Sequence, residues 1–256
     1  MTNTRSTSTQ GTIRGLERPG DDFPFHAHQT VTLSVSQWLI VLAAVGAGFA
    51  CLTVNVPVLT GDFGLLIRTL LFPLVPLVTL RVVAGRHWLG LFRRVRGADV
   101  GLMLGFALLN LLVSSLVGLL VMSLYGADLN LAVQALASQS TAEREWFFLR
   151  SLPQLFGEEI LTVLPFLAVL YVAHDRLNFT RTQSVLLAWL ISSVLFGLVH
   201  LPTYNWNLIQ CLLVIGSARL VLSLAYIRTK NIWVSTGAHI INDWTIFGIV
   251  LLSSPS

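Results

Sequence analysis

The sequence predicts an all-α fold, a polytopic membrane helix bundle of about seven transmembrane helices. Of the 256 residues, 54% are hydrophobic and only 11% are charged, whereas soluble domains carry about 25% charged residues. The hydrophobic residues also gather in long blocks, each close to the roughly 20 residues that a helix needs to cross a bilayer. These two observations exclude a soluble globular domain.

Seven hydrophobic blocks are separated by polar segments, and each is predicted to be a transmembrane helix. The first block carries no charge, the second holds Arg68 and two prolines, and the third follows a basic loop. A semi-polar stretch at 126–150 separates these three from the last four. The predicted spans are 37–58, 63–82, 100–125, 152–172, 184–202, 207–227 and 232–253. Together they predict a transmembrane bundle over 37–253.

Residues 1–36 precede the first span and are predicted to form a disordered, polar, cytosolic tail. Residues 1–30 are rich in Ser, Thr, Gly and Pro, a composition that does not bury enough hydrophobic surface to fold alone. They contain no hydrophobic stretch of the kind that a secretory signal peptide needs.

The positive charges predict the orientation, because Lys and Arg next to a span are disfavoured on the translocated side. Only Arg144 and Arg150 fall on the side opposite the N-terminus. Nine loop cations fall on the side of the N-terminus, namely Arg81, Arg86, Arg93, Arg94, Arg96, Arg176, Arg181, Arg228 and Lys230. We therefore predict an integral protein of the cell (plasma) membrane with a cytosolic N-terminus. The net charge of +4 belongs to these loops beside the lipid bilayer, and no nucleic-acid partner is expected.

Ionisable side chains inside the predicted spans mark the candidate site, because each costs several kcal/mol unless it has a partner. They are Arg68, Glu158, Glu159, His200, Arg219, His239 and Asp243. The alternative is that these groups form buried ion pairs that only fix helix packing. His239 and Asp243 lie four residues apart and share one helix face, whereas the adjacent glutamates point about 100° apart. Carboxylates and imidazoles in a water-poor site are suited to general base chemistry.

Three ordered motifs carry a resemblance to the CAAX-protease and bacteriocin-processing family of intramembrane proteases (CPBP, also called Abi). Its signatures EExxxR, FxxxH and HxxxN or HxxxD are similar to Glu158-Glu159, to the stretch from Phe196 to His200, and to His239 with Asp243. The resemblance covers roughly residues 150–250. It implies a membrane endopeptidase without a cofactor, acting on a membrane-associated peptide or protein. Bacteriocin-immunity proteins also belong to this family.

The resemblance also implies roles for the individual residues. Glu158 and His200 would activate a water, with Glu159 beside them, while His239 and Asp243 would stabilise the oxyanion. An oxyanion site needs hydrogen-bond donors, and an ionised carboxylate is not a donor. We therefore predict that Asp243 is protonated, or that Asn242 contributes the donor instead.

One motif position departs from the family pattern, because Val163 stands where the motif has Arg. Glu159 then lacks its usual cation. We predict that Arg219 pairs with Glu159 from another helix, and Arg68 is the less favoured partner. The alternative is that Arg219 extends to a lipid headgroup.

Other functions remain open at this point. Glu158, His200 and His239 could hold a catalytic zinc with one position left for water, although no HExxH motif is present and the resemblance favours glutamate chemistry. A non-enzymatic membrane immunity or binding protein of the same fold would retain the same residues, as would a small proton-coupled transporter. The turn around Tyr204 is interpreted as lying at the membrane interface, and the alternative is that it contacts the substrate. The loop histidines, His26, His28, His87 and His174, are given no special role.

Overall fold

The structure, a computed structural model, describes residues 12–26 and 31–253. Over these ranges the chain is helical and has no strand, as predicted. The longer helices are α1 (Val35–Thr53), α2 (Gly61–Ala84), α3 (Gly97–Tyr125), α5 (Thr141–Tyr171), α6 (Arg181–Val199), α8 (Gly216–Thr229) and α9 (Ile232–Ser253). The shorter ones are η1 (Gly85–Leu91), α4 (Leu131–Ser138), η2 (Val172–Arg176), η3 (Leu201–Tyr204), α7 (Leu208–Gln210) and η4 (Cys211–Ile215).

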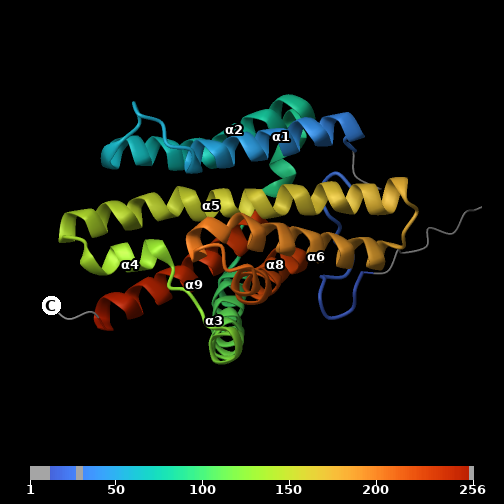
Figure 1. The fold of residues 1–256 in the computed structure, drawn as a ribbon. Coiled ribbons are helices and arrows are strands. Elements are labelled where there is room, and N and C mark those ends of the chain that lie inside the picture. The colour runs from blue at the N-terminus through green and yellow to red at the C-terminus, as the bar shows by residue number, and fades with distance from the viewer. Residues whose placement is uncertain (1–11, 27–30, 254–256) are drawn as a thin grey trace, which may run out of the picture.

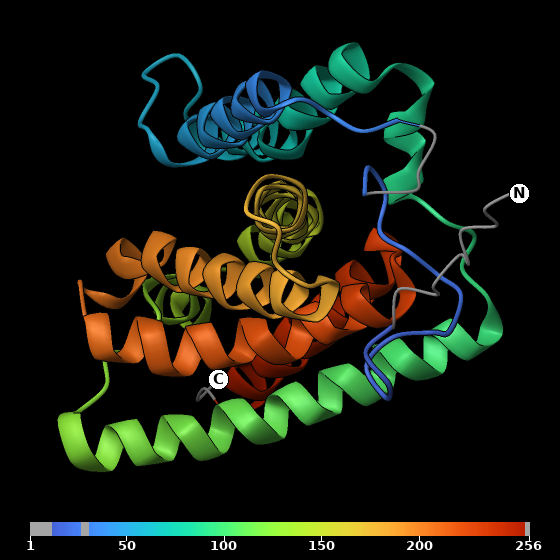
Figure 2. The same ribbon diagram turned by 90° about the vertical axis from the view of Figure 1, so that its right-hand side faces the viewer.

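Helix α5 lies at the centre of a layered bundle (Figure 1). The hairpin of α1 and α2 covers one side of α5, and α6 and α9 pack on the other. Figure 2 shows α5 end-on between these layers, with α3 running across the far face, where it packs on α8 and α9. Side chains of α5 can therefore meet side chains of α6, α8 and α9 inside the bundle.

Six helical segments are long and hydrophobic enough to cross a membrane, which is close to the predicted seven. They are Val35–Thr53, Gly61–Leu91, Gly97–Tyr125, Thr141–Arg176, Arg181–Val199 and Leu208–Thr229, and each overlaps one predicted span. The predicted seventh span is present as α9, a helix of 22 residues. Its polar residues His239, Asn242 and Asp243 lower its hydropathy, so it is not among the six. The chain is an integral membrane protein.

Helix α5 begins well before the predicted start of the fourth span near residue 152. Ser140 caps its N-terminus: the Ser140 hydroxyl accepts from the Glu143 backbone N–H, and the Glu143 carboxylate accepts from the Ser140 N–H. This reciprocal capping box stabilises a helix start within polar sequence. As a result, Glu158 lies near the middle of a 31-residue helix and at the level of the other site residues.

Of the predicted disordered tail at 1–36, the structure describes residues 12–26 and 31–36, and it packs 12–26 against the bundle; residues 1–11 and 27–30 lie outside the described ranges. Phe23 and Phe25 are buried in the main hydrophobic core. The Glu17 carboxylate is buried and receives hydrogen bonds from Arg181 at 2.6 and 2.7 Å and from Lys230 at 2.6 Å. A few aromatic and acidic residues thus anchor a segment whose average composition is polar, because loops of the bundle supply matching cations.

Candidate active site

The predicted site residues converge on one cavity of about 620 Å³ inside the bundle. Helix α5 contributes Glu158, His200 directly follows α6, α8 contributes Arg219, and α9 contributes three residues in one turn. The predicted residues that line the cavity are Glu158, His200, Arg219, His239, Asn242 and Asp243. Glu159 lies behind the cavity wall, where it contacts two of them.

The predicted ion pair between Glu159 and Arg219 is present. Arg219 is fully buried, and its Nη1 donates to Glu159 Oε1 at 2.5 Å. Its guanidinium carbon also lies 3.8 Å from the centre of the Phe196 ring, a favourable cation–π geometry. Arg68, the less favoured partner, instead donates to the backbone carbonyls of Cys51 and Leu52. Burial of Arg219 also leaves no path for its side chain to a lipid headgroup.

His239 lies between the two adjacent glutamates. Its Nδ1 is 2.9 Å from Glu159 Oε1 and 3.2 Å from Arg219 Nη2. Its Nε2 is 3.7 Å from Glu158 Oε2 and 3.7 Å from Asp243 Oδ1. The glutamates point in different directions, as predicted, yet they reach opposite nitrogens of one ring. Glu159 therefore orients His239, while Glu158 faces the cavity.

His200 has a defined tautomer in its neutral form. Its Nδ1 lies 2.7 Å from the backbone carbonyl of Phe196, one turn earlier in α6, and a carbonyl can only accept, so Nδ1 carries the proton. The other nitrogen, Nε2, then has a free electron pair and faces Glu158 Oε2 at 3.9 Å. Two acceptors at this separation do not bond directly, but a water molecule can bridge them.

Two polar residues that line the cavity, Gln154 and Asn110, were not predicted from the sequence. Gln154 donates to Glu158 Oε1 at 3.2 Å from one turn earlier in α5. Asn110 of α3 donates to Asn242 Oδ1 at 3.0 Å, and Asn242 Nδ2 donates to Asp243 Oδ1 at 2.8 Å. The sequence held one signal for each: Asn110 is an amide within a predicted span, and Gln154 stands four residues before Glu158. The amides form a chain that positions the Asp243 carboxyl at the cavity.

Tyr204 also lines the cavity, from the turn in which a substrate contact was left open. Its hydroxyl accepts a hydrogen bond from Asn130 Nδ2 at 3.0 Å. Burial raises the pKa of Tyr204 to about 12. The hydroxyl is therefore neutral at physiological pH and can donate a hydrogen bond into the cavity.

Side chains that could bind a metal ion cluster in a part of the chain away from this cavity. Among the described residues, His26, His174 and Asp175 form the one group of three His, Cys, Asp or Glu side chains whose ligand atoms all lie within 4.8 Å of one another. The trio considered for zinc, Glu158, His200 and His239, does not form such a group.

The fold and the site define a polytopic α-helical membrane protein whose helices surround a cavity lined by two carboxyl groups and two imidazoles. Residues 143–245 match the family model described as type II CAAX prenyl endopeptidase, Rce1-like. The matched segment runs from the start of α5 into α9 and includes every predicted site residue, so the resemblance predicted from the three motifs is confirmed. This is a family of proteases. Comparisons with curated proteins and with solved structures gave no match.

Proposed function

We propose that this protein is an intramembrane endopeptidase of the CAAX-processing or peptide-processing type, which cleaves a membrane-associated peptide or protein. The observation that carries the proposal is the pair Glu158 Oε2 and His200 Nε2, two acceptors 3.9 Å apart at the edge of a large cavity. A water that donates one hydrogen to each acceptor turns an electron pair toward the cavity. Such a water is positioned to attack a peptide carbonyl.

In the proposed reaction, Glu158 carries a proton from the water to the leaving nitrogen. The water oxygen forms a bond to the carbonyl carbon while Glu158 takes a proton from the water, and the carbonyl oxygen acquires the negative charge. When the C–N bond breaks, protonated Glu158 returns that proton to the leaving nitrogen. Gln154 holds the other oxygen of Glu158 at 3.2 Å and thereby keeps Oε2 directed at the water.

Helix α9 supplies the oxyanion donors, next to Glu158. His239 donates from Nε2 when both of its nitrogens carry protons, because Nδ1 uses its own proton in the 2.9 Å contact with Glu159 Oε1. Asp243 donates when it is protonated, and Asn242 fixes the orientation of its carboxyl group. Comparing Asp243→Asn, Asp243→Ala and Asn242→Ala separates direct donation by Asp243 from donation by Asn242. If Asp243 donates directly, Asp243→Ala lowers the cleavage rate, whereas Asp243→Asn keeps a donor and most of the rate. If Asn242 is the donor, Asn242→Ala lowers the rate.

The test of the function is cleavage by purified protein in lipid vesicles. Peptides ending in a CAAX motif, with and without a farnesyl group on the Cys, are incubated with wild type and variants, and products are identified by mass spectrometry. We expect Glu158→Gln and His200→Ala to lower the cleavage rate 10²–10⁴-fold, the usual contribution of a positioned base. The matched control is Glu145→Gln, the same substitution at an exposed position of α5.

Two outcomes would contradict the proposal. Equal cleavage by wild type, Glu158→Gln and His200→Ala removes these residues from the reaction. If no membrane peptide is cleaved by folded wild type in vesicles or in cells, the same cavity serves binding rather than hydrolysis, as in an immunity protein. Circular dichroism of each variant shows whether the helices are retained.

We further propose that the reaction uses glutamate chemistry and no metal. The carboxylate and the neutral imidazole supply both acceptors that the water needs. We expect activity to survive dialysis against a chelator, measured with the same peptides. The opposite result would assign Glu158, His200 and His239 as zinc ligands. In that case chelation abolishes the activity, stoichiometric zinc restores it in wild type, and zinc does not restore it in His239→Ala.

For the orientation, we propose that the N-terminus faces the cytosol of a cell with this protein in its plasma membrane. The N-terminal segment binds Arg93, Arg181 and Lys230, three cations of the group expected on the cytosolic side. Reporter fusions at the two ends of the chain test this placement, and an external N-terminal reporter would contradict it.

A further inference from the structure

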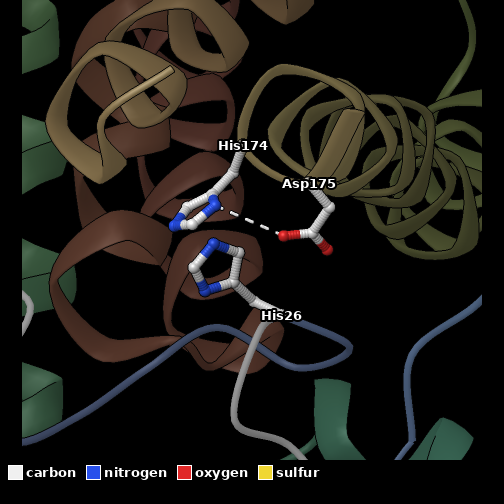
Figure 3. A group of neighbouring side chains, drawn as sticks. All are labelled: His26, His174 and Asp175. Atoms are coloured by element: carbon white, nitrogen blue, oxygen red, sulfur yellow. Dashed lines mark ion pairs between the residues drawn. The ribbon is translucent and has the colours of Figure 1, made fainter. Parts of the chain in front are cut away.

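A second cluster of ionisable side chains lies far from the proposed active site. His174 and Asp175 belong to η2, which continues α5, and His26 ends the described N-terminal segment (Figure 3). Glu158 lies 16 residues before His174, so the helical rise separates the two places by roughly 24 Å along the helix. The proposed peptidase reaction uses none of these three side chains. The structure thus gives a specific arrangement to two histidines that the sequence analysis left without a role.

The three side chains point toward one another. The ligand atoms of His26, His174 and Asp175 all lie within 4.8 Å of one another. His174 Nδ1 is 3.3 Å from Asp175 Oδ1, and Figure 3 shows the His26 imidazole beside this pair. The imidazole centres are 4.7 Å apart with the rings nearly perpendicular. In a tetrahedral site with metal–ligand bonds of about 2.0–2.2 Å, two ligand atoms lie roughly 3.3–3.6 Å apart, so small side-chain rotations complete the geometry.

His26 provides an independent indication of a ligand. The residue is only 2% exposed. Its Nδ1 lies 3.0 Å from Asp22 Oδ2, and Asp22 also pairs with Arg181 Nη2 at 2.9 Å. An ionised Asp22 can only accept, so Nδ1 carries the proton and directs the electron pair to Nε2. That buried Nε2 has no hydrogen-bond partner among the described residues.

This arrangement matches the way proteins prepare histidine ligands. A metal-binding His commonly donates its second nitrogen to a carboxylate, which fixes both the tautomer and the ring orientation. Asp22 has this relation to His26. A bound cation would also satisfy the orphaned Nε2, and a buried polar atom without a partner otherwise carries a free-energy cost.

We propose that His26, His174 and Asp175 bind a divalent transition metal of the zinc type, with a water as the fourth ligand. Two imidazoles and a carboxylate suit Zn²⁺ and its transition-metal neighbours, whereas Mg²⁺ and Ca²⁺ prefer sites built from oxygen. The ligands come from the N-terminal segment and from η2, so the metal joins the two. The site is independent of the proposed peptidase reaction.

The test uses zinc alone and protein that carries no polyhistidine tag. Metal-free protein in detergent is titrated with ZnCl₂, and bound zinc is measured after gel filtration by elemental analysis together with the unfolding temperature. We expect one zinc per chain and a rise in unfolding temperature for wild type. His26→Ala and His174→Ala abolish both effects, and the matched control His87→Ala, a histidine of η1, retains them. MgCl₂ at the same concentration gives no such rise.

Asp22→Asn provides a second variant that keeps all three ligands. Loss of a carboxylate behind a histidine ligand costs 10–100-fold in metal affinity, so its zinc titration midpoint moves up by that factor. The proposal is overturned if wild type retains no zinc, or if His26→Ala retains it. Zinc that is lost in His200→Ala but kept in His26→Ala would place the metal in the central cavity instead. Helix content by circular dichroism confirms that each variant is folded before the titration.

Discussion

Replacing Arg219 by Met tests whether the buried cation holds the centre of the site together. The substitution keeps a long side chain and removes the charge. Arg219 is 0% exposed, contacts the carboxylate of Glu159 at 2.5 Å and lies over the ring of Phe196 at 3.8 Å. Removing one partner of a buried pair leaves an uncompensated charge and costs about 3–5 kcal/mol, and a desolvated cation–π contact contributes about 2 kcal/mol. We therefore expect Arg219→Met to destabilise the fold by at least about 3 kcal/mol.

A double-mutant cycle isolates the pair from the loss of packing. Glu159→Gln with Arg219→Met removes both charges, so the double variant is expected to be more stable than Arg219→Met alone. Arg219→Lys keeps the charge, but a single ammonium cannot bridge Glu159 and His239 as the planar guanidinium does. The stability of Arg219→Lys is therefore expected to fall between that of wild type and that of Arg219→Met. Reversible unfolding of the purified protein in mixed micelles, followed by circular dichroism, gives each free energy. The reasoning is refuted if Arg219→Met lies within about 0.5 kcal/mol of wild type.

Three further predictions concern donation, packing and pH. Asp243→Asn keeps peptide cleavage within about tenfold while Asp243→Ala loses 10²–10³-fold, the effect of deleting one oxyanion donor; full activity of the alanine variant removes Asp243 from the site. Gly197→Ala places a Cβ 2.6 Å from the Cys211 carbonyl oxygen, so we expect overpacking to cost about 1–3 kcal/mol of unfolding free energy and to lower the cleavage rate. In the control Gly105→Ala the added Cβ meets no atom within 4 Å and is tolerated. Equal unfolding free energies of the two variants contradict this prediction. Burial alone would raise the pKa of Glu17, but hydrogen bonds from Arg181, the Ile13 amide and Lys230 outweigh it and lower the pKa. The stabilisation is therefore present above the unfolded pKa of about 4.3 and is lost as the pH falls through the folded pKa. Glu17→Gln should melt at a lower temperature than wild type at pH 7, with the difference closing below about pH 4, and a difference independent of pH would count against the ion pair.

The site could be predicted from the sequence because its chemistry conflicts with its surroundings. Charged groups in hydrophobic blocks are conspicuous, and helical spacing relates His239 to Asp243. The missing motif cation also pointed to Arg219, since a buried carboxylate needs a partner. In each case, a free-energy cost that is visible in the sequence indicated a contact in the fold.

Other features left weaker signals in the sequence. Gln154 and Asn110 are neutral amides, which cost less in a hydrophobic span than a charge does, and their partners depend on how α3 and α5 pack. The start of α5 at Thr141 depends on a cap within polar sequence rather than on hydrophobicity. The packing of residues 12–26 depends on contacts with Arg181 and Lys230, which lie more than 150 residues away in sequence.

The buried pair of Glu17 with Lys230 constrains the order in which the chain is assembled. A ribosome makes Glu17 early, yet Lys230 lies in the turn between α8 and α9 and emerges last among the partners of this carboxylate. The contact of this segment with Lys230 can therefore form only after all the long helices up to α8 have been made. Docking of residues 12–26 is thus completed late in biogenesis, and a quality-control protease could detect its failure as a free, cleavable segment.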